Sequence, residues 1–219
     1  MRKNSVHPRR GVFITVEGPE GAGKSSQLRL LAEYLESRGR SCLCTREPGG
    51  TPLAETIRAV VKNHRGAEAM SPETELLLME AARIQHVRGV IAPALTAGID
   101  VLCDRFTDST TAYQGGGRGI PFSEIRKLNT FAQAGCAPDL TLLLDLDPEI
   151  GFRRASGREE TRGQYDRFEA EKLEFHRRVR AAFLAIARAE PKRIRIVDAS
   201  GSVNQVQSEI RKIVDAFIG

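Results

Sequence analysis

A glycine-rich segment near the start of the chain carries the strongest chemical signal in the sequence. Residues 18–25 read GPEGAGKS and match the pattern G-x-x-x-x-G-K-[S/T], which binds the phosphates of nucleotides. Its glycines let backbone N–H groups turn toward phosphate oxygens, while Lys24 can reach the β- and γ-phosphates and the Ser25 hydroxyl can ligate Mg²⁺. We therefore predict an ATP-binding loop, called the P-loop below, in which the contributing residues are Gly18, Pro19, Glu20, Gly21, Ala22, Gly23, Lys24, Ser25 and Ser26.

Two other interpretations of this motif are weaker. A tight strand-to-helix turn could contain Lys-Ser by chance, but the segment lies directly between an apolar run and an amphipathic helical pattern, as the motif requires. A regulatory GTPase would need a DxxG segment after the third strand and an NKxD segment for guanine. The sequence contains no NKxD, and its DxxG lies at 198–201, far too late in the chain.

Three arginines lie where a second phosphate could bind. Arg46 in REPGGT and Arg105 in DRF end predicted strands, the edge at which open α/β sheets bind ligands, and Arg83 lies in the helical segment AARIQH. Arg105 could clamp a phosphate with two hydrogen bonds, and Asp104 could hold a Mg²⁺-bound water. Taken singly, each arginine could form only a surface ion pair and Asp104 could cap a turn; we interpret His86 as an ordinary, partly exposed histidine. Together with a P-loop, the three cations favour binding of a second phosphate.

Short β-rich runs alternate with helical patterns along the chain, which predicts βαβ units around a parallel sheet. The expected strands are 12–16, 41–45, 101–103, 140–144 and 194–197. The expected apolar stripes of the helices are Leu28, Leu31 and Leu35; Ile57, Val60 and Val61; Leu76, Leu77, Met79 and Ala82; and Val206, Ile210, Ile213, Val214 and Phe217. Ser71 and Ser202 are predicted N-caps, the second in a capping box with Gln205.

Two segments depart from this alternation. Residues 115–119 read GGGRG, which costs conformational entropy in any regular element, so we predict a loop there. Residues 156–167 are polar, charged and interrupted by glycine, and we predict a mobile lid at about 153–167. The remainder, 11–219, is expected to form a single domain.

The net charge of +5 and the pI near 9.2 raise nucleic acid as a partner, but the excess is local. Residues 1–10 carry four basic and no acidic side chains, and we expect a disordered tail there. Residues 153–180 carry nine basic and six acidic side chains, so the rest of the chain is slightly acidic. We therefore expect no nucleic acid partner.

The cysteines and the apolar runs bear on the compartment. Cys42, Cys44, Cys103 and Cys136 lack CxxC spacing and three of them lie in predicted strands, so we expect buried free thiols and a cytoplasmic protein. No apolar run is long enough to cross a membrane, so we expect no membrane as a partner.

The sequence resembles the bacterial thymidylate kinases over residues 11–199. The shared segments are VEGPEGAGKSS, TREPGGTPLAE, AARIQH, DRFTDSTTAYQGGGRG, DLTLLLDLDPEIG and DRFE. The resemblance implies an α/β, three-layer P-loop NTPase fold with a five-stranded parallel sheet flanked by helices, with a mobile lid. It also implies a homodimer that phosphorylates dTMP with MgATP.

The resemblance further assigns roles to matched positions. Glu20 would face the sugar and the acceptor phosphate, which Arg46 and Arg105 would grip. Arg83 would address the thymine carbonyl, and the other expected substrate-binding residues are Pro48, Met79, Thr110, Tyr113 and Gln114. Ser25 and Asp104 are the expected metal ligands, and Ser200 lies near the expected adenine loop.

Two features distinguish this chain within the pattern. Met79 stands where the family commonly places a phenylalanine that stacks on thymine; alternatively, it belongs to the core. Gly21 follows the acidic P-loop residue, which in the family goes with a lid that supplies the catalytic arginine. The lid arginines are Arg153, Arg154, Arg158 and Arg162. We favour Arg158 as catalytic, with Arg162 and Arg153 as alternatives, and interpret Arg167 as an ion-pair partner of Glu169 or Glu171.

Three rival functions stay open at this point. Met79 keeps open a kinase for another monophosphate, such as dUMP. The basic tail keeps open a DNA-associated P-loop ATPase, which predicts DNA-stimulated hydrolysis. A catalytically silent binding module is disfavoured by the presence of Lys24, Ser25, Asp104 and Arg105.

Overall fold

A computed structural model describes residues 10–64, 66–156, 167–168 and 170–219. The five strands are β1 (Phe13–Glu17), β2 (Cys42–Arg46), β3 (Asp100–Asp104), β4 (Leu140–Asp145) and β5 (Ile194–Asp198). The α-helices are α1 (Lys24–Ser37), α2 (Pro52–Asn63), α3 (Pro72–His86), α4 (Ala92–Thr96), α5 (Thr107–Thr110), α6 (Phe122–Ala132), α7 (Pro148–Ser156), α8 (Leu173–Ala189) and α9 (Val203–Ile218). Two wider, π-helical segments are η1 (Val87–Ile91) and η2 (Thr111–Gly117).

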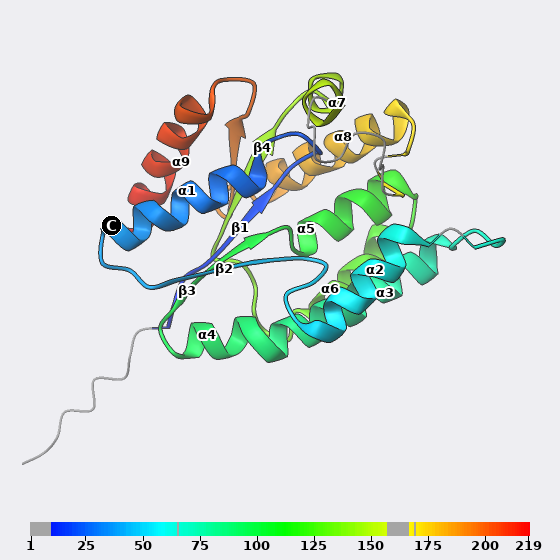
Figure 1. The fold of residues 1–219 in the computed structure, drawn as a ribbon, viewed down its shortest axis with the longest axis horizontal. Helices are drawn as coiled ribbons and strands as arrows, with labels where there is room; N and C mark the ends of the chain where they lie inside the picture. The colour runs from blue at the N-terminus through cyan, green and yellow to red at the C-terminus, as the bar shows by residue number, and fades with distance from the viewer. Residues whose placement is uncertain (1–9, 65, 157–166, 169) are drawn as a thin grey trace, which may run out of the picture.

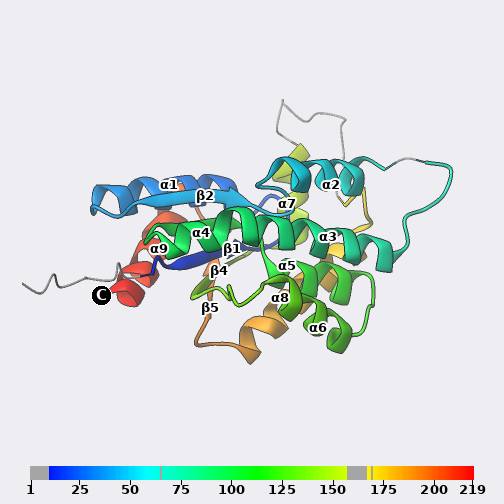
Figure 2. The same ribbon diagram turned by 90° about the horizontal axis from the view of Figure 1, so that it is seen from below.

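The strands form one parallel sheet in the order β2-β3-β1-β4-β5, so the predicted fold class is confirmed. Helices α1 and α9 lie side by side over one face (Figure 1). The opposite face packs against η1 and α4 near β1 and β3, and against η2 and α8 near β4 and β5. Helices α2, α3 and α6 lie at the end of the molecule opposite α9 (Figure 2).

Strand register brings the predicted site residues to one edge. Val16 of β1 pairs with Asp104 of β3, which in turn pairs with Arg46 of β2. The carboxyl ends of these three strands are therefore level, and the P-loop, the Arg105 turn and the REPGGT segment leave the sheet side by side. Such an edge is where open α/β sheets bind ligands.

The helix starts follow the predicted capping signals. Ser71 accepts a hydrogen bond from the Thr74 backbone N–H over 3.1 Å, and Ser202 forms the full capping box with Gln205. The apolar stripes are only partly buried, however: Val60, Leu77 and Phe217 are exposed. The prediction was wrong for these three because each stripe is wider than the face that the neighbouring element covers.

The loop prediction was wrong for the three glycines of GGGRG, which are helical, whereas Arg118 and Gly119 lie outside the helix. Gly115, Gly116 and Gly117 belong to η2, which packs closely on its neighbours. A Cβ on Gly116 would lie 2.5 Å from the Ala182 Cβ of α8, and one on Gly117 would lie 2.4 Å from the Phe175 ring. The glycines therefore serve close helix packing here.

The thiols also differ from the expectation. All four cysteines are free, but only Cys103, on a central strand, is buried. Cys44 is exposed and Cys42 is half-buried because β2 is an edge strand. Arg10, expected to belong to the tail, donates to Asp139 over 2.8 Å; residues 1–9 lie outside the described residues. Among the described helices, none is both long and apolar enough to span a bilayer.

Candidate active site

The P-loop leads from β1 directly into α1. Gly21 has a φ of 74°, and a Cβ there would lie 2.3 Å from the Gly151 carbonyl oxygen, so a glycine is required. Lys24 opens α1 with a buried side chain, whose Nζ donates to the Pro19 carbonyl oxygen over 2.8 Å. Burial, together with the positive charge of Arg105, lowers the pKa of Lys24 to about 8. Anionic phosphate oxygens would therefore be strongly stabilising partners for this ammonium group.

The two predicted metal ligands lie next to each other. The Ser25 hydroxyl donates to Asp104 Oδ2 over 2.7 Å. Hydroxyl and carboxylate oxygens suit Mg²⁺, which takes few protein ligands and completes its octahedron with water and substrate phosphates. The described part of the chain holds no cluster of three or more metal-binding side chains. The Ser25–Asp104 pair therefore fits an ion that arrives with the nucleotide.

Arg105 lies directly after β3 in a strained backbone conformation, with a φ of 71°. Its Nη1 donates to the Gly18 carbonyl oxygen and to Ser109 Oγ, both over 3.1 Å, and its Nη2 donates to the Tyr113 hydroxyl over 3.2 Å. The Glu20 carboxylate lies 3.7 Å from the guanidinium. These contacts fix a cation beside the P-loop, and strain of this kind is kept where the surrounding structure holds it.

Glu17, which we did not predict as part of the site, holds the turn after Arg105. Its Oε1 accepts from the backbone N–H of Phe106 over 2.7 Å, and its Oε2 accepts from the Ser109 hydroxyl over 2.6 Å. The side chain is fully buried, and burial together with the Asp108 carboxylate raises the pKa of Glu17 to about 7. Because the Ser109 hydroxyl also accepts a hydrogen bond from Arg105, Glu17 helps to hold the Arg105 guanidinium without touching it.

The raised pKa of Glu17 predicts a specific pH dependence of stability. The folded chain holds the Glu17 proton more tightly than the unfolded chain, so this contribution is present below the unfolded value of 4.5 and lost as pH rises through about 7. Glutamine at this position cannot titrate. We therefore expect the free energy of unfolding of Glu17→Gln, relative to that of the wild type, to increase by up to roughly 3 kcal/mol between pH 4.5 and 8. Urea unfolding across this range measures the difference, with exposed Glu33→Gln as the control; a constant difference for Glu17→Gln would contradict the prediction.

The REPGGT segment presents one arginine to solvent and one carboxylate to the interior. Arg46 is exposed and pairs with Glu55 of α2, whose carboxylate also accepts from the Gly50 N–H over 3.0 Å. The adjacent Glu47 is buried, and its backbone N–H donates to the Asp104 carbonyl oxygen over 2.9 Å. Arg46 is thus free to exchange a surface ion pair for an anionic ligand.

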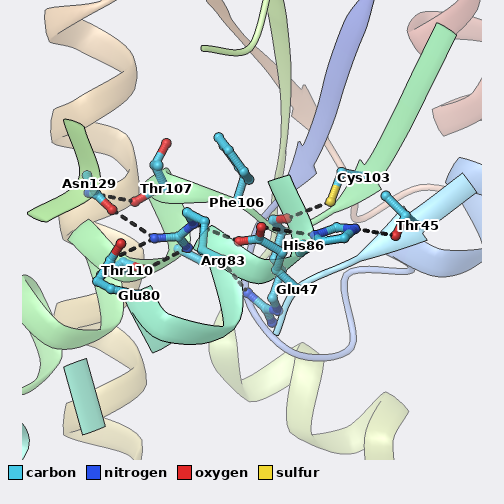
Figure 3. Close-up of polar contacts among 12 residues, drawn as sticks. Thr45, Glu47, Glu80, Arg83, His86, Cys103, Phe106, Thr107, Thr110 and Asn129 are labelled. Atoms are coloured by element: carbon cyan, nitrogen blue, oxygen red, sulfur yellow. Dashed lines mark hydrogen bonds and ion pairs between the residues drawn. The ribbon is translucent and has the colours of Figure 1, made fainter. Parts of the chain in front are cut away.

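Arg83 is the centre of a buried polar network (Figure 3). Its Nε donates to Glu47 Oε2 over 2.7 Å, and its Nη1 donates to Glu80 over 2.7 Å and to Asn129 over 2.9 Å. Its Nη2 donates to Thr110 Oγ1 over 2.9 Å. A guanidinium has five N–H donors, so one on Nη2 is left over from these four bonds.

His86 is fully buried, so our interpretation of a partly exposed histidine was wrong. Its Nδ1 lies 3.1 Å from Glu47 Oε1 and its Nε2 lies 2.7 Å from the Thr45 hydroxyl. The helical pattern gave no sign of these partners because they come from a different segment of the sequence.

The segment from α5 to η2 supplies three further predicted residues. Thr110 and Gln114 are buried, and Gln114 Nε2 donates to the Glu75 carboxylate over 2.7 Å. Tyr113 packs edge-on against Phe168, with ring centroids 5.8 Å apart. Phe168 thus supports the Tyr113 ring, and the Tyr113 hydroxyl accepts a hydrogen bond from the Arg105 guanidinium.

These elements enclose one cavity of about 470 Å³. The predicted residues that line it are Glu20, Gly21, Gly23, Lys24, Ser25, Ser26, Arg46, Pro48, Met79, Arg83, Asp104, Arg105, Thr110, Tyr113 and Gln114. Gly18, Pro19, Ala22 and Arg153 are not among the lining residues. Lining residues that sequence reasoning missed are Glu47, Arg58, Lys62, Phe106, Ser109, Phe168 and His176. Four of them lie inside the matched segments, which was the available signal for them: Glu47, Phe106, Ser109 and Phe168.

The lid region is described only at its two ends. Arg153 is exposed on α7, while Arg154 donates to the carbonyl oxygens of Ala199 and Ser200 over 2.8 and 2.9 Å. The favoured Arg158 and its alternative Arg162 lie outside the described residues.

Arg167 pairs with Glu75 of α3, so the prediction of Glu171 as its partner was wrong. Glu171 instead pairs with Arg118, and the other predicted partner, Glu169, lies outside the described residues. The cause is the packing of this segment against α3, which the sequence alone did not show.

Comparisons with known proteins agree on one family. The family model described as thymidylate kinase matches residues 16–210. A thymidylate kinase from Pseudomonas fluorescens (strain SBW25) is 53% identical over 95% of this chain and 97% of its own length. One from a Synechococcus strain is 52% identical over 93% and 94%. The crystal structure of thymidylate kinase from Ehrlichia chaffeensis is 34% identical, covers 94% of this chain and 99% of that chain, and has a TM-score of 0.77.

Proposed function

The chain belongs to the thymidylate kinase family, and on that premise we propose that its cavity transfers the γ-phosphoryl group of ATP to dTMP, giving dTDP and ADP. The observation that carries the proposal is the convergence of Lys24, Arg46 and Arg105 on one cavity from three separate segments. Two phosphates repel each other, so joining them requires several cations at one place.

The donor side is the P-loop. Its backbone N–H groups and Lys24 would hold the ATP phosphates, and Ser25 and Asp104 would hold Mg²⁺. When bound, Mg²⁺ neutralises charge on the β- and γ-phosphates. Arg154 holds the carbonyl oxygens of Ala199 and Ser200, and this backbone would lie near the adenine.

The acceptor side is the opposite wall of the cavity. Arg105 and Arg46 would grip the dTMP phosphate, and Glu20 would face the sugar and that phosphate. Arg83 would donate its remaining N–H to a thymine carbonyl. Met79, Pro48, Thr110, Tyr113 and Gln114 would contact the sugar and base.

The transfer needs little covalent help from the protein. The 5′-phosphate oxygen of dTMP is already ionised at neutral pH, so no strong general base is needed. Lys24 and Arg105 would stabilise the charge that spreads over the equatorial oxygens, and the cavity walls would align the reacting atoms. Because hydrogen bonds to the protein hold both cations, little reorganisation would accompany the reaction.

A panel of nucleoside monophosphates tests the substrate. In a coupled assay of ADP release, we expect dTMP to give the highest kcat/KM, ahead of dUMP, dCMP and purine nucleotides. The comparison with dUMP is the sharpest because Met79, half-buried at the cavity wall, replaces the expected aromatic ring. Preference for another nucleotide would overturn the proposal, and DNA-stimulated hydrolysis without monophosphate turnover would point to the ATPase.

We expect the lid arginine Arg158 to act on the transition state rather than on dTMP binding. Arg158→Ala should lower kcat more than it raises KM for dTMP, because a guanidinium that arrives on the transferring group stabilises developing charge. Steady-state kinetics with either nucleotide varied would measure this. A normal kcat for Arg158→Ala, with a reduced one for Arg162→Ala or Arg153→Ala, would move the role accordingly.

We also propose a homodimer. Five large apolar side chains are exposed on the end formed by α2, α3 and α6, and a second copy of the chain would cover them: Leu53, Val60, Leu77, Phe122 and Phe131.

A cytoplasmic location is supported by the four free cysteines.

A further inference from the structure

The polar network around Arg83 continues away from the cavity to the edge of the sheet (Figure 3). Thr45 Oγ1 lies 2.7 Å from His86 Nε2, His86 Nδ1 lies 3.1 Å from Glu47 Oε1, and Glu47 Oε2 accepts from Arg83 Nε over 2.7 Å. The chain of contacts joins the end of β2, the REPGGT segment and α3. Only Arg83 and Glu47 of these four residues line the cavity.

The network is deeply buried. His86 is 0% exposed, Arg83 3% and Glu47 5%. Removing charged groups from water is costly unless they are paired and hydrogen-bonded. Apolar contacts could join α3 to the REPGGT segment at a lower desolvation cost. The polar contacts found there instead therefore indicate a functional role.

Packing allows the His86 ring little freedom. A Cβ on Gly50 would lie 2.3 Å from His86 Nε2 and 2.9 Å from Thr45 Oγ1, so the loop backbone presses directly on the ring. With Nε2 beside the Thr45 hydroxyl, Nδ1 faces the Glu47 carboxylate. Glu47 is thereby held in the orientation that accepts from Arg83.

Arg83 is consequently fixed in its plane. Bonds at Nε to Glu47 and at Nη1 to Glu80 and Asn129 prevent rotation of the guanidinium. The direction of the remaining N–H bond on Nη2 is therefore set by the side chains that hold Nε and Nη1, which are Glu47, Glu80 and Asn129. A donor with a fixed direction pairs with a carbonyl and rejects an amino group at the same place.

We propose that His86 and Glu47 are positioning residues that set the base specificity of the site by holding Arg83. The inference rests on the proposed assignment of Arg83 to a carbonyl of the acceptor base. His86 acts through Glu47 and touches no substrate. The ligand feature selected is a pyrimidine carbonyl, so dCMP, which carries an amino group in place of the 4-carbonyl of dTMP, is the discriminating competitor.

The test compares dTMP with dCMP in His86→Leu and Glu47→Gln. We expect kcat/KM for dTMP to fall roughly tenfold or more, the cost of breaking a buried charged hydrogen bond, while that for dCMP and the KM for ATP change little. The preference for dTMP over dCMP therefore falls by the same factor. His64→Leu, at the exposed end of α2, is the matched control and should leave all three values unchanged.

A conservative pair separates positioning from packing. The amide nitrogen of His86→Asn falls near the position of Nδ1 and should restore much of the preference, whereas that of His86→Gln falls near Nε2 and should not. If His86→Leu does not fold, this pair and Glu47→Gln decide. An equal loss for dTMP, dCMP and ATP in all variants would overturn the inference and leave a structural role.

Arg83→Leu distinguishes failure of the inference from failure of its premise. If Arg83→Leu retains the preference for dTMP, Arg83 does not read the base and its proposed role fails. If Arg83→Leu loses the preference while Glu47→Gln and His86→Leu keep it, only the positioning role is overturned.

Discussion

Replacing Lys24 with alanine is expected to abolish turnover, with kcat reduced on the order of 10³-fold or more. The Lys24 side chain is 8% exposed, and its Nζ is held by the Pro19 carbonyl oxygen at the start of α1. No other described cation on the P-loop, residues 18–25, can replace it there. Steady-state ADP release at saturating ATP and dTMP measures the loss.

Two further measurements make the Lys24 result specific. Lys127→Ala removes an exposed lysine of α6 that pairs with Glu124, and it should leave kcat unchanged. In the wild type, kcat/KM for ATP should decrease above about pH 8, where Lys24 of the free enzyme loses its proton. Retention of turnover by Lys24→Ala would remove Lys24 from the reaction, whereas a flat profile to pH 10 would show that the pKa of Lys24 is not lowered.

The frame of the site could be predicted from sequence because its signals are local. The apolar runs predicted all five strands, and each predicted strand end lies within one residue of the observed end. Ser71 and Ser202 correctly predicted the starts of two helices. Motif spacing then placed the P-loop, Arg46 and Arg105 at strand ends, which parallel pairing brings to one edge. Each of these inferences depends only on residues adjacent in the chain.

The supporting residues could not be predicted because their partners are distant in sequence. Glu17 binds the turn after Arg105, and His86 meets Glu47 from another element. Nothing in the spacing of a single glutamate or histidine identifies such a partner. The glycines of η2 misled for a similar reason, since their purpose is close contact with α8, a helix formed by residues 173–189.

Arg105 combines backbone strain with a central position in the site, so we expect two small replacements to have the same effect on activity but different effects on stability. Arg105→Ala and Arg105→Gly both remove the guanidinium that bonds to Gly18, Ser109 and Tyr113. Both should lower kcat/KM for dTMP on the order of 10³-fold, with a much smaller effect on KM for ATP. Kinetics with dTMP varied at saturating ATP would measure this.

The two variants should nevertheless differ in stability. A φ of 71° strains alanine but not glycine, so Arg105→Gly should be more stable than Arg105→Ala by about 1 kcal/mol in urea unfolding. The lost side-chain contacts are the same in both and cancel in the comparison. Equal stability would mean that the turn relaxes without the side chain, and the strain at Arg105 would then be imposed by its own guanidinium contacts rather than by Glu17 and the strand end. A higher stability of the glycine variant, together with its inactivity, would show that the arginine is kept at this position for phosphate binding and against the preference of the backbone.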